Sequence, residues 1–136
     1  MGNLPCSDNE LQELSDFNNI SLETLSFSNN KISLIDIFQN RKLDILSCAN
    51  NKLSALDTRK QFDIRYLDCS NNQTKTICVG DIEKATVNSK ISRWNGSANG
   101  VTSYYWKIDN GATFHVVNRN ILQKFLQKTD LREFFV

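Results

Sequence analysis

Four cysteines and one histidine are the residues of this chain with the most distinctive chemistry, because thiolates and imidazoles act as nucleophiles and metal ligands. A zinc site needs such residues in close pairs, and the chain has neither a Cys-x-x-Cys pair nor a second histidine beside His115. A cysteine–histidine nucleophile would need a thiol beside His115 and a third group to orient the imidazole. The sequence around His115 indicates neither, so we expect no catalytic residue, no metal and no cofactor.

Carboxylates and glycines supply the other common ingredients of active sites. Asp36 and Asp57 are not a catalytic pair in this interpretation, because they hold equivalent places 21 positions apart and are expected to bond their own backbone in turns. The five glycines form no phosphate-binding pattern. We therefore expect the protein not to be an enzyme, and an active site within residues 94–136 is the minor alternative.

Composition and charge narrow the class of protein further. The chain has 136 residues, of which 40% are hydrophobic and 23% charged, as in one ordinary globular domain. Its formal charge of +1 gives no reason to expect a nucleic acid or an anionic membrane as partner. No apolar run is long enough to span a bilayer, and the first residues lack the pattern of a secretion signal.

Three of the four cysteines follow an internal repeat of 21 residues, and Cys78 falls outside it. Residues 22–32, 43–53 and 64–74 align at that spacing, and residues 4–11 continue the register upstream. Apolar and small polar residues alternate in each copy, which predicts one short parallel strand per copy. One inward column holds Cys6, Phe27, Cys48 and Cys69. These cysteines are therefore expected to be small buried hydrophobic residues, with a disulfide between Cys48 and Cys69 as a minor alternative.

An asparagine follows each predicted strand. Its amide can donate to and accept from backbone groups that the turning chain leaves unpaired between copies. We interpret this column as a structural asparagine ladder in preference to a set of ligand contacts. Its members are Asn9, Asn30, Asn51 and Asn72.

The repeat resembles the leucine-rich repeat, with the pattern L-x-x-L-x-L-x-x-N/C-x-L, over residues 1–79. The 21-residue length, the cysteine column and the Cys-Ser-Asn-Asn sequence of residues 69–72 are similar to a short type of leucine-rich repeat found in bacterial surface and secreted proteins. The resemblance implies an α/β-type repeat solenoid, with parallel strands on a concave face and a mostly irregular convex side. Thr58 and Thr74 replace aliphatic residues of the pattern, so we expect looser packing in the last copies.

The register ends after residue 79, and two further segments are expected. Residues 80–100 are interpreted as a C-terminal cap and loop, with a short helix or irregular stretch at 82–88. Residues 101–136 are predicted to hold a hairpin of 103–108 and 112–117 around Asn110-Gly111, in which the aromatic residues fill a core, with a recognition patch as the minor alternative. An amphipathic helix follows, capped by Asn118 or Asn120. Its apolar side chains are expected either to dock on the repeats or to make a partner or self-association contact, and they are Ile121, Leu122, Phe125 and Leu126.

The sequence thus favours a non-catalytic module that binds a protein or another macromolecule through its concave parallel sheet. Ile45 and Tyr66 are the expected anchors, and Asp68 adds a directional contact. The full set of predicted contact residues is Thr24, Ser26, Ser28, Ile45, Ser47, Tyr66, Asp68 and Ser70. The alternative is a piece of a larger secreted or cell-surface, adhesin-like protein, in which the repeats act as a structural spacer.

Overall fold

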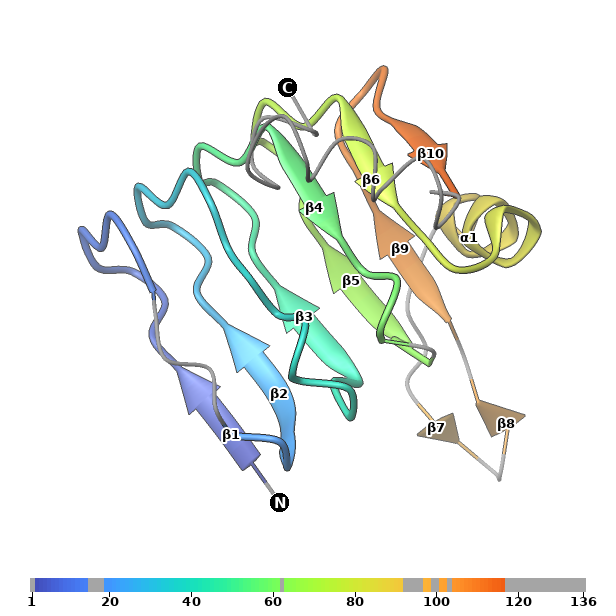
Figure 1. Ribbon diagram of the computed structural model, residues 1–136, viewed down its shortest axis with the longest axis horizontal. Coiled ribbons are helices and arrows are strands. Elements are labelled where there is room, and N and C mark those ends of the chain that lie inside the picture. Colours follow the sequence, from blue (N-terminus) through green and yellow to red (C-terminus); the bar gives the residue numbers. More distant parts are fainter. Residues whose placement is uncertain are drawn as a thin grey trace, which may run out of the picture.

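Short parallel strands dominate the computed structural model, which describes residues 2–14, 19–61, 63–91, 97–98, 101–102 and 104–116. Successive repeat copies lie side by side, so that equivalent segments form layers across the molecule (Figure 1). Two parallel sheets run along this row of copies, one on each side of an apolar core.

The larger sheet takes one strand from each copy, in the order β1-β2-β3-β5-β9. Its strands are β1 (Gly2–Pro5), β2 (Leu22–Ser26), β3 (Ile45–Ser47), β5 (Tyr66–Asp68) and β9 (Tyr105–Lys107). All four pairings are parallel, and Leu25 aligns with Leu46 and then with Leu67, each 21 positions on. The prediction of one short parallel strand per copy is confirmed.

A second parallel sheet lies on the opposite side, in the order β10-β6-β4. Its strands are β4 (Ala55–Asp57), β6 (Thr76–Cys78) and β10 (Thr113–His115). The expectation of a mostly irregular side is therefore wrong for the later copies. Their backbones approach closely enough to bond, as in the contacts from Thr58 N to Cys78 O (2.9 Å) and from Val79 N to His115 O (2.8 Å).

The core between the sheets is built from the inward columns. Leu25, Phe27, Leu46 and Leu67 are fully buried, which is the main stabilising contribution in a stack whose copies cannot bury their apolar faces alone. The two departures from the repeat pattern are also buried, and each hydroxyl has a backbone acceptor. Thr58 Oγ1 donates to Cys78 O (3.1 Å), and Thr74 Oγ1 donates to Leu53 O (3.4 Å). The expected loosening at these positions is thus offset by bonds between copies.

The predicted hairpin is wrong. Trp106 of β9 aligns with Leu67 in the larger sheet, whereas Phe114 of β10 aligns with Ile77 in the smaller one. A turn does join them, with Ala112 N donating to Asp109 O (3.2 Å) and Gly111 at a φ of 82°. However, this turn carries the chain from one sheet to the other. Burial of Trp106 against the stack outweighs the local pairing that Asn-Gly favours in isolation.

The short helix predicted at 82–88 is confirmed as α1 (Ile82–Ser89). Asp81 caps it, because its side chain accepts from Lys84 N (3.0 Å), and Ala85 points into the core. It does not close the stack as expected, since the chain continues into a further copy made of β9 and β10. The antiparallel pair β7 (Ser97–Ala98) and β8 (Val101–Thr102) lies between α1 and β9 in the chain. The helix predicted from Asn118 or Asn120 falls outside the described residues.

Candidate functional site

The outward face of the five-stranded sheet brings the predicted contact residues together. Because side chains alternate across a strand, the residues between the core columns all face this side. The register aligns them in two rows. The first row is Thr24, Ile45, Tyr66 and Tyr105, and the second is Ser26, Ser47, Asp68 and Lys107. Ser28 and Ser70 follow one position beyond the inward column. We call this surface the outer sheet face.

The first copies contribute a small, polar part of this face. Ser26 Oγ lies 2.9 Å from Ser7 Oγ, and Ser28 Oγ lies 2.9 Å from Ser47 Oγ. These hydroxyls therefore already bond one another across copies. Such a surface offers little apolar area and few free polar groups, so it contributes weakly to binding.

The later copies contribute an aromatic strip, which we define as Ile45, Tyr66 and Tyr105. The two tyrosine rings stack, with centroids 5.6 Å apart and an interplanar angle of 24°. All three residues are half-buried, which leaves part of each side chain open to solvent. Burial, followed by the negative charge of Asp68, raises the pKa of the Tyr66 phenol, so the ring stays neutral at physiological pH. Stacked, rigid aromatic residues are typical anchors of protein interfaces.

Tyr105 and Lys107 extend the predicted site and were missed by sequence reasoning. The sequence does place these two residues on the same face of one strand, opposite Trp106. Their membership in the repeat was hidden because 39 residues, instead of 21, separate Leu67 from Trp106. A search for a further copy beyond the predicted helix at 82–88 could have found them.

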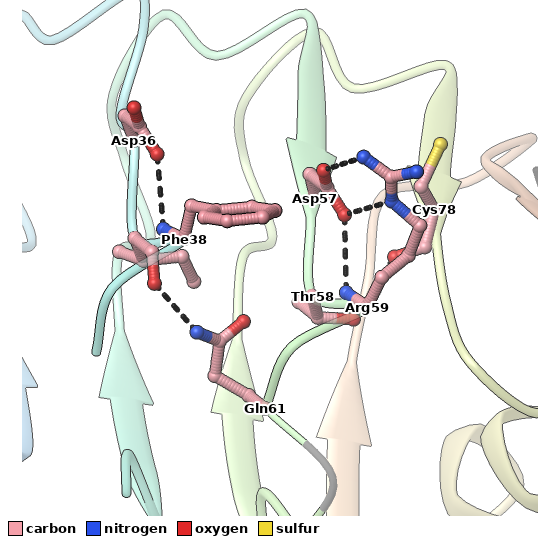
Figure 2. Close-up of polar contacts among 8 residues, drawn as sticks. Asp36, Phe38, Asp57, Thr58, Arg59, Gln61 and Cys78 are labelled. Atoms are coloured by element: carbon pink, nitrogen blue, oxygen red, sulfur yellow. Dashed lines mark hydrogen bonds and ion pairs between the residues drawn. The ribbon is translucent and has the colours of Figure 1, made fainter. Parts of the chain in front are cut away.

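Asp68 plays a different role from the predicted directional contact. Its Oδ1 accepts from Ser70 N (3.1 Å) and from Ser70 Oγ (2.6 Å), so this oxygen fixes the turn after β5. The same turn chemistry, predicted for the repeat column of aspartates, is confirmed in Figure 2. There Asp36 Oδ1 accepts from Phe38 N (2.9 Å), and Asp57 Oδ1 accepts from Arg59 N (3.0 Å).

Charged groups flank the aromatic strip where the strands begin. Arg65 forms an ion pair with Asp44 of the preceding copy, and this hydrogen bond raises the pKa of the guanidinium. Tyr104 Oη donates to Asp63 Oδ1 (2.6 Å), and Lys84 Nζ approaches the same oxygen at 3.3 Å. The hydrogen bond from Tyr104 lowers the pKa of Asp63, while the same bond raises the pKa of Tyr104. This cluster ties α1 and the last copy to the fourth.

The asparagine column forms hydrogen bonds within and between copies. Asn51 is the example at the centre: its Nδ2 donates to Cys48 O (3.1 Å) and to Phe27 O (3.1 Å) of the preceding copy. Its Oδ1 accepts from Ile32 N (3.1 Å). Asn30 and Asn72 repeat this arrangement. Asn9, in the first copy, bonds only its own turn. These contacts confirm that the asparagine column bonds the backbone, as the structural ladder predicts.

A second polar column was not anticipated. The residue before each ladder asparagine has a left-handed backbone, with φ between 54° and 60°, which asparagine and aspartate tolerate better than most residues. The column consists of Asp8, Asn29, Asn50 and Asn71. Asn29 Nδ2 donates to Asp8 Oδ1 (2.6 Å), and Asn50 Nδ2 donates to Asn29 Oδ1 (2.8 Å). The Asn-Asn pair that recurs in the repeat sequence could have predicted this column.

The cysteines are free thiols in the structure. Burial raises the pKa of Cys48 and of Cys69, and it raises that of Cys78 to about 12, so these thiols stay protonated and unreactive. Cys78 lies beside the Asp57–Arg59 ion pair (Figure 2). Within the described ranges, no three His, Cys, Asp or Glu side chains are grouped as metal ligands.

Comparison with known proteins supports the fold. The structure matches that of the functional domain of InlJ, a leucine-rich repeat protein of Listeria monocytogenes, with a TM-score of 0.55 and 21% sequence identity. The match covers 87% of this chain and 27% of the InlJ chain. Parallel sheets with few helices thus define a leucine-rich-repeat-like fold. No protein-family model and no curated protein sequence matches the chain. In the part of the chain that is described, no helix is long and apolar enough to cross a membrane.

Proposed function

We propose that this chain is a non-catalytic leucine-rich repeat solenoid that binds a protein partner through the outer sheet face. The aromatic strip is the observation that carries this proposal. Ile45, Tyr66 and Tyr105 come from three adjacent copies, and they form continuous apolar area on an otherwise polar face. Interfaces gain most of their binding energy from a few such anchors, surrounded by polar groups that exclude water.

The surrounding residues suit this role. Ser47 is small and lies two positions after Ile45 on the same face of β3, so it leaves room for a partner side chain beside the strip. Ser70 is buried, and its hydroxyl already donates to Asp68. The ion pair of Arg65 with Asp44 forms a charged rim at one margin. The proposed contact set therefore keeps Ile45, Ser47, Tyr66 and Asp68 from the residues expected from the sequence and adds Tyr105 and Lys107. Thr24, Ser26 and Ser28 lie in the polar part of the face, which contributes weakly.

Paired alanine substitutions test this proposal. Ile45→Ala with Tyr66→Ala should weaken partner binding by about 2 kcal/mol or more, since it removes two anchors. Thr24→Ala with Ser26→Ala is the matched control, because it changes the same face in a part without apolar anchors. Affinity is measured by calorimetry, and far-ultraviolet circular dichroism checks that both variants fold. Equal affinities for the two variants would remove the strip as the binding site.

A second candidate function is that of a repeat segment within a larger secreted or surface protein. The likeness to InlJ favours it, because this chain spans 27% of the InlJ chain. The functional domain of InlJ includes a cysteine ladder, and the inward column here holds Cys6, Cys48 and Cys69, with Phe27 between the first two. An antibody against the repeats would separate the two candidates, since a larger protein gives a band well above 15.6 kDa.

A further inference from the structure

The two edges of the five-stranded sheet differ in how they meet a further strand. In the five-stranded sheet, the residue directly after the second-row residue of a strand donates its backbone N–H to the next strand. These bonds are Phe27 N to Ser47 O (2.8 Å), Cys48 N to Asp68 O (2.8 Å) and Cys69 N to Lys107 O (2.9 Å). Lys107 aligns with Asp68, so Ile108 follows Cys69 in this series. The N–H of Ile108 therefore points to the outer side of β9.

The opposite edge is blocked. Cys6 N donates inward to Ser26 O (2.7 Å), so the neighbouring position, Pro5, faces outward along β1. Proline has no N–H, and its presence on an edge strand prevents regular pairing with another strand. Pro5 is the one proline of the chain. The stack thus has one edge that rejects a parallel strand and one that offers the groups to bind it.

A groove runs along the open edge. It has a volume of about 340 Å³ and is lined by residues 105–112 of β9 and the following turn, with Ser89 and Ile91 at the end of α1 as the other wall. β9 is the last strand of its sheet in the described part of the chain. Ile108 is only partly buried, although Phe27, Cys48 and Cys69 of the same column are fully buried between neighbouring copies. Another strand in this groove would bury it.

We propose that the groove beside β9 binds an extended segment of a partner protein as an added parallel strand, with an acidic residue opposite Lys107. Main-chain bonds to Trp106 and Ile108 would supply affinity, as in other strand-addition complexes. Lys107 is exposed and points outward, so it selects the residue that lies beside it across the strands. The segment would alternate, with apolar side chains over Trp106 and Ile108 and a carboxylate between them.

Synthetic peptides and the full-length protein test this proposal. One acetylated and amidated peptide has the sequence Ser-Thr-Val-Glu-Val-Thr-Ser, and its partner has Lys in place of Glu. We expect the Glu peptide to bind about three-fold more tightly than the Lys peptide, because a cross-strand charge pair contributes modestly. Lys107→Glu should reverse the order. Lys52→Glu, which changes an exposed lysine of the third copy, is the control and should leave the order unchanged.

Amide hydrogen exchange on the same samples shows where the peptide binds. In the free protein the Ile108 N–H should exchange at least about ten-fold faster than the Cys69 N–H, which has a partner strand, and it should slow when the Glu peptide is added. Two results would overturn the proposal. One is an Ile108 amide already as protected as that of Cys69 without peptide, which would mean that the chain itself covers the edge. The other is peptide binding that ignores Lys107.

This inference is independent of the aromatic strip. Ile45→Ala with Tyr66→Ala leaves the outer side of β9 unchanged, so that variant should keep its peptide affinity even when it loses the protein partner. A variant that loses both would place the peptide on the outer sheet face instead, and would contradict the edge site.

Discussion

The regular middle copies and the last copy solve the same structural problem with different residues. In the middle copies, asparagines satisfy the backbone groups exposed by each turn, as Asn51 and Asn72 do. In the last copy, Gly111 lies in the turn and has no side chain to do this, so Asp109 takes the role: its Oδ1 accepts from Asn72 N (3.0 Å), and its Oδ2 accepts from Thr74 N (2.9 Å). A repeat column is thus defined by the backbone groups it must satisfy, and residue identity follows from that need.

Trp106 should give the largest effect, because it is the anchor that holds the last copy on the stack. Its side chain is 7% exposed, and its Nε1 donates to Ile64 O (2.9 Å). Trp106→Ala leaves a cavity and an unpaired carbonyl, and we expect a loss of about 4 kcal/mol in the unfolding free energy of that copy. Hydrogen exchange should show the loss in β9 and β10, with β2 and β3 still protected. Uniform loss across all strands would contradict a separate last copy.

Removing a ladder asparagine from the middle should come next. Asn51→Ala leaves the buried N–H of Ile32 without its acceptor. It also removes one of the two asparagine donors to each of Phe27 O and Cys48 O, and about 3 kcal/mol of stability should be lost in total. The matched variant Asn9→Ala, at the exposed start of the column, should lose less than about 1 kcal/mol. Urea unfolding measures both. Equal losses would mean that the bonds between copies contribute nothing beyond the local turn.

Asp109 tests whether one carboxylate replaces the ladder asparagine. Asp109→Ala should lower the unfolding free energy by about 2 kcal/mol, since two backbone N–H groups lose a charged acceptor. Asp109→Asn should recover part of this, because an amide keeps one of the two acceptor oxygens. The same urea experiment applies. If Asp109→Asn loses as much stability as Asp109→Ala, an amide at this position does not replace the carboxylate, and the comparison with the ladder asparagines is wrong.

The cluster that ties the last copy to the fourth should give the smallest effect, and it depends on pH. The hydrogen bond from Tyr104 lowers the folded-state pKa of Asp63, so its stabilising contribution is present above the unfolded-state pKa of about 4 and is lost as pH falls through the lower folded-state value. Asp63 is largely exposed, so solvent screening limits the effect to a few tenths of a kcal/mol. Tyr104→Phe should reduce this acid dependence.

The measurement is the unfolding free energy between pH 6 and pH 2.5 for wild type and for Tyr104→Phe. Lys31→Ala is a suitable control, since it removes an exposed charge of the second copy and leaves the bond between Tyr104 and Asp63 in place. Parallel pH profiles for wild type and Tyr104→Phe would exclude the hydrogen bond to Asp63 as the cause.

The sequence predicts the repeated part of the fold well, because each 21-residue step places the same residue types in the same environment. The strands at Leu25, Leu46 and Leu67 follow from alternation, and the asparagine column follows from the need to bond turning backbone. The last copy could not be predicted in this way, because the inserted helix breaks the spacing before Trp106. Local turn chemistry at Asn110-Gly111 then favoured a hairpin that burial of Trp106 overrides.

The same reason limits the predicted site. Ile45 and Tyr66 were identified because they stand out among serines and threonines in a regular column. Tyr105 was placed on a different element, although in the structure its ring stacks on Tyr66. The site is therefore best recognised from register, which only the fold supplies for the last copy.

Photo-crosslinking from the aromatic strip tests the proposed function most directly. A photoreactive benzoylphenylalanine replaces Tyr66 in the full-length protein, and the control replaces Leu34, an exposed residue of the second copy that lies away from the outer sheet face. Incubated with extract of the cells that make the protein, the Tyr66 position should yield a discrete protein adduct that excess wild-type protein abolishes, while the Leu34 position yields none. An adduct that forms equally from both positions, or only from Leu34, would contradict binding through the outer sheet face.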